Sequence, residues 1–229
     1  MIEAILWDVD GTLLDFLAAE KAAIRAVFES MGLGYCTDEQ IARYSVINKK
    51  YWKRMEDGEI TKAEVLSGRF EEFFAGEGIV ADVDEFNVRY QTALGDTVVF
   101  FDEGDSLLRE FRGRVKQYAV TNGTRRAQRR KLANSGLDQI FDGVFISDEV
   151  GHEKPTVEFF AHVFREIGDV SRDRVLIVGD SLSSDIRGGK NAGIRTCWYN
   201  PSRAQAPEEM RPDYEISNLA EVRYILDEQ

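Results

Sequence analysis

Short runs of consecutive apolar residues recur along the chain and predict buried β-strands. The runs are nearly continuous rather than alternating with polar residues, which is typical of a parallel sheet whose two faces are both covered. Helical patterns separate most of these runs, so the sequence predicts an α/β protein. The predicted strands are Ala4–Trp7, Gln117–Val120, Gly143–Ile146, Val175–Val178, Thr196–Tyr199 and a last short strand, Tyr214–Ile216.

Three of the predicted helices end in the same way, with a glycine followed by an apolar residue. Glycine adopts the left-handed conformation just past the end of a helix, and the next apolar residue packs back onto the helix. The order of strand, helix, glycine and strand repeats from about residue 116 to 199, which predicts an open sheet with right-handed crossovers. The three signals are Met31-Gly32-Leu33, Ser135-Gly136-Leu137 and Ala192-Gly193-Ile194.

The segment after the first strand has a different pattern. It contains no convincing strand, and its apolar spacing predicts helices over Leu17–Met31, Asp38–Asp57 and Thr61–Phe74. We therefore expect a helical domain of residues 16–95, inserted into a core domain of residues 1–15 and 96–229. The predicted fold class is α/β, with a Rossmann-like doubly wound parallel sheet and an inserted helical domain.

Charge and composition narrow the range of functions. The chain has 29 Lys and Arg against 41 Asp and Glu, which gives a formal net charge of −12. Such a chain is a poor non-specific partner for nucleic acid or for an anionic membrane. No apolar run approaches the roughly 18 residues of a membrane span, and the N-terminal run is too short for a signal peptide. We therefore expect a cytoplasmic protein, and the sequence predicts no oligomeric state.

The few cysteines and histidines of the chain do not form a recognisable catalytic pattern. Cys36 and Cys197 lie far apart in the sequence and in no CxxC pattern, which is typical of reduced thiols in the cytosol. His152 and His162 are the only histidines, so a histidine metal site or a Ser-His-Asp triad has little support. Acid–base chemistry must come mainly from carboxylates and lysine.

Polar side chains follow four of the predicted strands, close to the point where each strand ends. At any one strand end they are explained by a turn or by helix capping. Because the carboxyl ends of parallel strands meet at one edge of a sheet, however, all of these groups would face one another. In strand order, they are Asp8 and Asp10, then Thr121 and Asn122, then Lys154, then Asp180 and Asp185.

This combination of groups indicates a particular chemistry. Clustered carboxylates repel one another, and a hard cation with oxygen ligands, Mg²⁺ above all, relieves that repulsion. Carboxylates, Mg²⁺, a lysine and small hydrogen-bond donors are together typical of a phosphoryl-transfer site.

The residues at these strand ends closely resemble the haloacid dehalogenase-like (HAD) phosphohydrolase superfamily. The resemblance covers residues 1–15 and 96–229, and the helical insertion is similar to the family's helical cap. A looser resemblance, carried by residues 47–52, 58–61 and 69–70, is to the branch that contains the pyrimidine 5′-nucleotidases active on noncanonical nucleotides. The four motifs occur in order as Asp8-x-Asp10-Gly11-Thr12, Thr121-Asn122, Lys154-Pro155, and Gly179-Asp180 with Asp185.

The resemblance implies a role for each carboxylate. Asp8 would attack phosphorus and form an aspartyl-phosphate. Asp10 would protonate the leaving alcohol and then deprotonate the attacking water. Mg²⁺ would be held by the Asp8 side chain, the Asp10 backbone carbonyl and Asp180. Asp185 would support the ion directly or through water.

The resemblance also implies how the substrate is held. The partner would be a small phosphorylated molecule, with a pyrimidine nucleoside 5′-monophosphate ranked first. Because the core recognises only the phosphoryl group, the choice of substrate should lie in the cap. The candidate phosphate-binding residues are Thr121, Asn122 and Lys154, and the candidate base or sugar contacts are Tyr44, Asn48, Trp52 and Arg69.

Other activities stay open at this point. A sugar-phosphate phosphatase or a phosphomutase would use the same core residues. A phosphonoacetaldehyde hydrolase would need a cap lysine, for which Lys49, Lys50 and Lys53 are candidates. A haloacid dehalogenase needs neither Mg²⁺ nor a second Asp two residues on, so Asp10 and Asp180 disfavour it.

Two further classes of protein are disfavoured. A signalling receiver domain also groups acids, Thr and Lys at strand ends, but it is near half this length and lacks a helical insertion. The presence of every motif residue disfavours an inactive interaction protein. The basic run Thr124–Lys131 could suggest a nucleic-acid surface, but on a helix its charges spread over several faces, which predicts a solvated helix.

Overall fold

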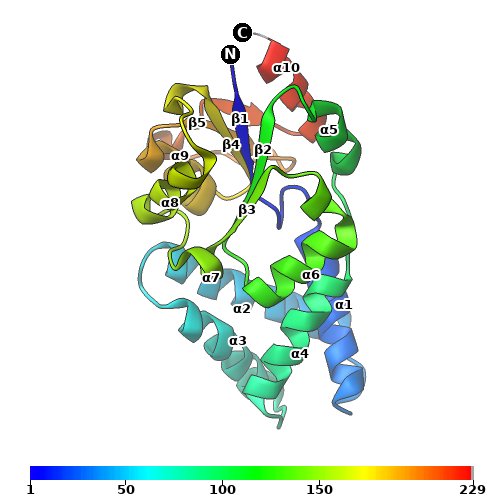
Figure 1. Ribbon diagram of the computed structural model, residues 1–229. Helices are drawn as coiled ribbons and strands as arrows, with labels where there is room; N and C mark the ends of the chain where they lie inside the picture. The colour runs from blue at the N-terminus through cyan, green and yellow to red at the C-terminus, as the bar shows by residue number, and fades with distance from the viewer. Residues whose placement is uncertain (228–229) are drawn as a thin grey trace.

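A parallel β-sheet forms the centre of one half of the molecule, and a group of helices forms the other half (Figure 1). The computed structural model describes residues 1–227. Within this range the sheet has six strands, all parallel, in the order β3-β2-β1-β4-β5-β6. This order confirms the predicted doubly wound α/β fold. The strands are β1 (Ala4–Trp7), β2 (Lys116–Thr121), β3 (Gly143–Ile146), β4 (Val175–Gly179), β5 (Arg195–Tyr199) and β6 (Tyr214–Ile216).

Helices cover both faces of the sheet and make up the segment inserted after β1. None of the helices in residues 1–227 combines the length and the hydropathy that crossing a bilayer requires. The helices are α1 (Phe16–Ser30), α2 (Asp38–Glu56), α3 (Lys62–Glu77), α4 (Val83–Asp96), α5 (Gly104–Phe111), α6 (Arg125–Ser135), α7 (Ser147–Val150), α8 (Val157–Ile167), α9 (Arg187–Ala192) and α10 (Val222–Asp227).

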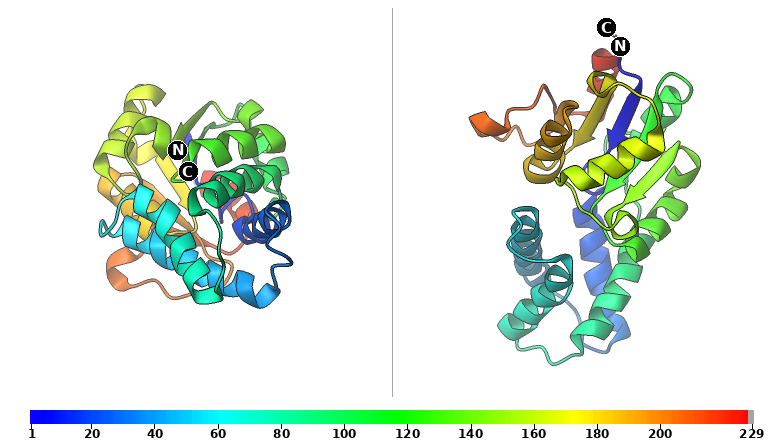
Figure 2. Two further views of the ribbon diagram at one scale, coloured as in Figure 1. Left: turned by 90° about the horizontal axis from the view of Figure 1, so that it is seen from below. Right: turned by 60° about the vertical axis from the view of Figure 1, so that its left-hand side comes forward.

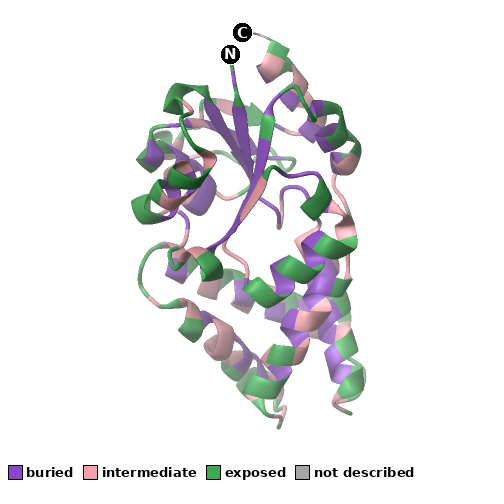
Figure 3. Cartoon of the chain, viewed as in Figure 1, coloured by how far each residue is buried: buried purple, intermediate pink, exposed green. Residues whose placement is uncertain are grey.

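The sheet is buried on both faces, as its continuous apolar strands predict. In β1, Ile5 and Trp7 point into one apolar cluster, which contains residues of α5, α6 and α10. Ala4 and Leu6 point into a second cluster on the opposite face, with residues of α8 and α9. The buried strands and the exposed outer surfaces of the helices are visible in Figure 3.

Helices α1 to α4, which we call the helical layer, have an apolar cluster of their own. Phe70 lies at its centre, 5.1 Å from the stacked ring of Tyr44 and 4.8 Å from the ring of Phe86. The sequence predicts α1, α2 and α3 to within a few residues at each end but does not single out α4. Its buried residues Phe86, Tyr90 and Leu94 lie four positions apart, which is a helical spacing.

Two antiparallel segments of chain connect the helical layer to the sheet. The backbone N–H of Asp15 donates to the carbonyl of Val99 at 2.8 Å, and that of Phe101 donates to the carbonyl of Leu13 at 3.0 Å. Because the first of these segments leaves the carboxyl end of β1, the helical layer lies beyond that end of the sheet (Figure 2, right). The N-terminus lies at the opposite end of the molecule (Figure 1).

Candidate active site

The strand order places a crevice beside β1. The chain runs from β1 to β2 and β3 on one side and from β4 to β5 and β6 on the other, so the winding reverses between β1 and β4. Ligands of open α/β sheets bind beyond the carboxyl ends of the strands at such a reversal. Asp8 directly follows β1, its backbone N–H donates to the carbonyl of Val178 at 2.9 Å, and Asp180 directly follows β4. Both carboxylates therefore lie at this crevice.

Three carboxylates meet there. Asp8, Asp180 and Asp185 each offer an oxygen, and these oxygens all lie within 4.8 Å of one another. Asp8 and Asp185 are buried, whereas Asp180 reaches solvent. The hydroxyl of Thr12 joins two of them, because it donates to Asp8 Oδ2 at 3.0 Å and accepts from the backbone N–H of Asp180 at 3.0 Å.

Two glycines make room for this cluster. Gly11 has a φ of 92°, in the left-handed region, and a Cβ there would lie 2.7 Å from Asp180 Oδ2. A Cβ on Gly179 would lie 2.2 Å from the carboxyl carbon of Asp185. Larger residues at either position would push the carboxylates out of place.

Lys154 is the buried cation of the cluster. Its Nζ donates to Asp8 Oδ1 at 2.7 Å, to Asp185 Oδ1 at 2.7 Å and to the carbonyl of Val120 at 2.9 Å, and its side chain is only 1% exposed. Burial alone would lower the pKa of Lys154, but the charges of Asp185 and Asp8 outweigh it and raise the pKa above its ordinary value. Lys154 is therefore charged at neutral pH.

The same surroundings raise the pKa values of the three carboxylates. Burial, with a smaller contribution from the charge of Asp185, raises the pKa of Asp8 to about 7, although Lys154 opposes the shift. Burial also raises the pKa of Asp185. Partial loss of hydration, together with the charges of Asp8 and Asp185, raises the pKa of Asp180 well above its ordinary range. One lysine thus does not balance three acids, and the site favours a further positive charge.

A divalent metal ion fits this site. The cluster consists of carboxylate oxygens alone, which are the ligands that hard cations such as Mg²⁺ prefer. Among the described residues, the cluster brings together three of the four aspartates that the sequence predicts as metal ligands. The fourth, Asp10, is predicted to bind through its backbone carbonyl, and its side chain points to α6, where it accepts hydrogen bonds from Gln128 and Lys131.

The predicted phosphate-binding residues Thr121 and Asn122 lie at the end of β2, and Asn122 contacts Lys154. The side-chain amide of Asn122 donates to the carbonyl of Lys154 at 2.8 Å and accepts from the Lys154 backbone N–H at 2.8 Å. Both polar atoms of the Asn122 side chain are therefore engaged in holding Lys154. The hydroxyl of Thr121 accepts from the backbone N–H of Gly123 at 3.1 Å, so it faces the turn that leads into α6.

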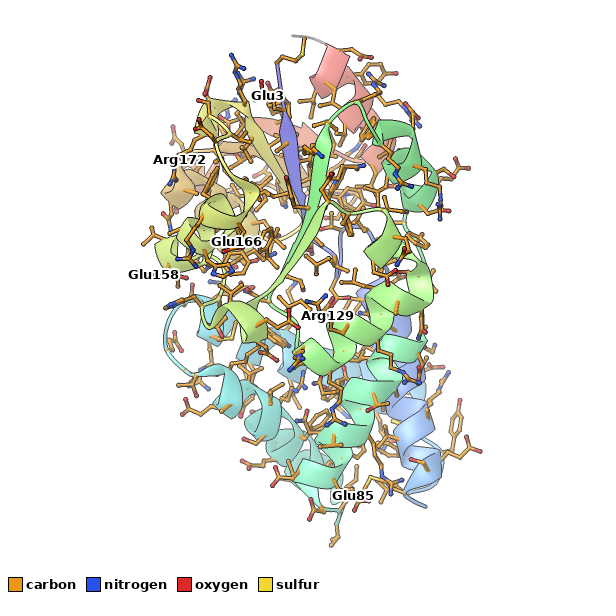
Figure 4. All side chains as sticks on the ribbon, in the orientation of Figure 1. Glu3, Glu85, Arg129, Glu158, Glu166 and Arg172 are labelled. Atoms are coloured by element: carbon orange, nitrogen blue, oxygen red, sulfur yellow. The ribbon has the colours of Figure 1, made fainter. Side chains whose placement is uncertain are left out.

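Residues 124, 127, 128 and 131 of the basic run are buried, so the expectation of a solvated helix is wrong for one of its faces. The arginines of α6 are exposed, and Figure 4 shows Arg129 projecting toward α7, where Glu149 pairs with it at 2.9 Å. Lys131 is only 1% exposed and forms an ion pair with Asp10. Positions 124, 128 and 131 fall on one face of the helix, but all three residues are polar, so the local pattern does not indicate that this face is buried.

The helical layer contributes one carboxylate near the cluster that sequence reasoning missed. Glu56, at the end of α2, accepts hydrogen bonds from Ser181, at 3.5 Å, and from Ser183. Burial raises the pKa of Glu56. The two serines follow β4 and Asp180, so Glu56 joins the helical layer to the carboxylate cluster.

The other candidate residues of the helical layer lie in two environments. Tyr44, Asn48 and Arg69 are buried inside it, where Arg69 donates to Asn48 at 2.8 Å. Trp52 is half-buried. The three lysines considered for a Schiff base, Lys49, Lys50 and Lys53, are exposed, and the last two pair with surface acids.

The sequence matches the haloacid dehalogenase-like hydrolase family over residues 2–193. The structure is similar to the solved structure of a protein named as HAD-hydrolase YfnB, from Bacillus subtilis. That crystal structure is described as bound to magnesium and as revealing interdomain movement. The two structures agree with a TM-score of 0.92 at 36% sequence identity, over 99% of each chain.

Two curated relatives are similar along nearly their whole length. Pyrimidine 5′-nucleotidase PynA of Streptococcus pneumoniae is 35% identical over 97% of this chain and 94% of its own. Pyrimidine 5′-nucleotidase YjjG of Escherichia coli is 33% identical over 97% of this chain and 96% of its own.

Replacement of Lys154 tests how far the fold depends on its charge. In Lys154→Met, Asp8 and Asp185 stay buried but lose the cation between them, so the free energy of unfolding should fall by about 3–5 kcal/mol. The measurement is urea unfolding, followed by far-ultraviolet circular dichroism, in a buffer that contains a metal chelator.

Lys116→Met is the matched control for this prediction. Lys116 also lies 2.7 Å from an aspartate, Asp142, but 64% of its side chain is exposed. A surface ion pair of this kind contributes at most about 1 kcal/mol. Equal losses of stability in the two variants would contradict the structural role assigned to Lys154.

Proposed function

The chain belongs to the haloacid dehalogenase-like hydrolase family, and on that premise we propose that it is a Mg²⁺-dependent phosphomonoester hydrolase. In this proposal the phosphoryl group passes through an aspartyl-phosphate on Asp8. The observation that carries it is the cluster at the winding reversal, where three carboxylates converge within 4.8 Å around one buried lysine. We further propose that residues 16–95 act as the cap domain over this site.

The first step joins Asp8 to phosphorus. An oxygen of the Asp8 carboxylate forms a bond to the phosphorus atom as the bond from phosphorus to the ester oxygen breaks. Mg²⁺ bound by Asp8, Asp180, Asp185 and the backbone carbonyl of Asp10 would neutralise charge on the phosphoryl oxygens. Before substrate binds, Thr12 and Lys154 hold the two Asp8 oxygens from different sides, at 3.0 and 2.7 Å, which fixes the orientation of the nucleophile.

Asp10 moves the protons in both steps. In the first step its carboxylic acid gives a proton to the ester oxygen, and the alcohol leaves. In the second step the Asp10 carboxylate takes a proton from water while the water oxygen bonds to phosphorus. The bond between phosphorus and Asp8 then breaks, which releases phosphate and returns both aspartates to their starting states.

Lys154 and its neighbours would hold the phosphate oxygens. An ammonium group has three donors, and Lys154 now directs them to Asp8, Asp185 and the carbonyl of Val120. We infer that the donor now bound to Asp8 turns to a phosphate oxygen when substrate binds, which frees the nucleophile. Asn122 would act mainly by holding the Lys154 backbone, and Thr121 would offer its hydroxyl.

The relatives support a nucleotide as the substrate. PynA and YjjG are both named as pyrimidine 5′-nucleotidases, and each matches this chain at 33% identity or more over nearly its whole length. A long nucleic acid is a poor candidate, because three of the four arginines of α6 pair with acids of the same surface. Arg125 and Arg129 pair with Glu149, and Arg130 pairs with Asp96. A small pyrimidine nucleoside 5′-monophosphate is the partner that we propose.

Replacement of Asp8 tests the nucleophile. Asp8→Asn keeps the shape of the side chain but removes the attacking charge, so Mg²⁺-dependent phosphate release should fall to the background rate. The circular dichroism spectrum should stay that of the wild type. Asp142→Asn, a matched change at the amino end of β3, should retain full activity. Wild-type turnover by Asp8→Asn would show that the nucleophile is wrongly assigned.

A substrate panel tests the proposed specificity. With Mg²⁺ present, kcat/KM should be highest for the 5′-monophosphates of uridine, deoxyuridine and thymidine, and lower for sugar phosphates. The measurement is phosphate release, with Asp8→Asn as the blank for every substrate. Efficient hydrolysis of sugar phosphates, with the three nucleotides ignored, would overturn the nucleotidase proposal. A requirement for a sugar bisphosphate would indicate a phosphomutase instead.

A further inference from the structure

A buried cation on α6 contacts Asp10 and has no part in the mechanism described so far. Lys131 is 1% exposed, and its ammonium group forms an ion pair with Asp10 Oδ1. Gln128, also 1% exposed, donates from Nε2 to Asp10 Oδ2 at 2.6 Å. The two oxygens of one carboxylate are thus held by two different side chains of the same helix.

The burial of Lys131 is unusual for this helix. Arg125, Arg129 and Arg130 have at least half of their side chains exposed and pair with acids at the surface. A lysine removed from water loses hydration energy, which a partner charge must offset. Here that partner is Asp10, whose own side chain is 21% exposed and so remains open to the crevice.

The surroundings of α6 fix the positions of both side chains. Thr124 begins the helix by accepting from the backbone N–H of Ala127 at 3.3 Å, and its hydroxyl donates to Gln91 of α4 at 2.7 Å. Gly123 leaves the space that Gln128 occupies, because a Cβ there would lie 2.2 Å from Gln128 Nε2. The start of α6 is therefore anchored both to the turn after β2 and to the helical layer.

Proton transfer is sensitive to the orientation of the carboxyl group. A free aspartate side chain rotates about its Cβ–Cγ bond, and only some of its orientations direct an oxygen toward the reacting atoms. Groups held close to a productive geometry contribute much of the rate advantage of an enzyme. Two donors, one on each oxygen, remove most of this rotation and leave each oxygen a second lone pair, on which the transferred proton would be carried.

We propose that Lys131 and Gln128 are positioning residues that hold the Asp10 carboxyl group in the orientation in which it transfers protons. The inference rests on the proposed function, because it requires Asp10 to be the acid and base of phosphate-ester hydrolysis. It assigns to α6 a role in protonating the leaving group, in place of a role in attracting an anionic substrate.

The test compares two esters that differ in how much help their leaving groups need. Nitrophenolate is a weak base and leaves without a proton, whereas the 5′-oxygen of a nucleoside is strongly basic and must be protonated as it leaves. The ratio kcat/KM reports only the steps up to the departure of the alcohol. We therefore measure kcat/KM with Mg²⁺ for p-nitrophenyl phosphate and for uridine 5′-monophosphate.

Lys131→Met should lose activity selectively. For uridine 5′-monophosphate we expect kcat/KM to fall by about tenfold or more, which is part of the 10²–10⁴-fold contribution of general acid catalysis. For p-nitrophenyl phosphate it should change by less than about threefold, since this step does not use the acid. Gln128→Met should show the same selectivity to a smaller degree. Lys116→Met, the control, should match the wild type on both esters.

Two results would overturn the inference while leaving the proposed function intact. One is an equal loss on both esters in Lys131→Met and Gln128→Met, which would indicate a structural role alone. The other is wild-type activity of both variants on uridine 5′-monophosphate. If Lys131→Met does not fold, as judged by its melting curve, Gln128→Met decides between these results. A wild-type protein that hydrolyses neither ester with Mg²⁺ would instead overturn the proposed function, and the inference with it.

Discussion

The repulsion among three carboxylates at the carboxyl ends of β1 and β4 is the constraint on which the rest of the structure depends. Asp8, Asp180 and Asp185 place oxygens within 4.8 Å of one another, and two of the three are buried. Lys154 offsets part of this charge, Asn122 holds the Lys154 backbone in place, and the glycines at 11 and 179 give the carboxylates room. These carboxylates therefore form a site that favours the binding of a further positive charge.

The helical layer and the core meet around this site, and α6 belongs to both. One face of α6 reaches Asp10 through Gln128 and Lys131, and its first turn is tied to α4 through Thr124 and Gln91. On the other side of the crevice, Glu56 of α2 reaches the serines that follow Asp180. A movement of the helical layer would thus reach Asp10 on one side of the crevice and the segment after Asp180 on the other.

Much of the fold could be predicted from the sequence because the central strands are buried on both faces and are therefore nearly continuous apolar runs. The convergence of Asp8, Lys154 and Asp180 followed from the same parallel arrangement. The direction of individual side chains could not be predicted. Asn122 turns to the backbone of Lys154, and the charge of Lys131 concealed its place on the buried face of α6. Such details depend on tertiary contacts that local patterns do not contain.

The binding of Mg²⁺ to the purified protein, measured by isothermal titration calorimetry, tests the central claim most directly. We predict that the wild type binds one Mg²⁺ per chain. The Asp180→Asn variant should bind it at least roughly tenfold more weakly, because it loses a charged oxygen ligand. Asp142→Asn, which lies at the amino end of β3 and away from the carboxylate cluster, should bind Mg²⁺ like the wild type. An absence of Mg²⁺ binding by the wild type, or an unchanged affinity in Asp180→Asn, would contradict a metal-dependent carboxylate site.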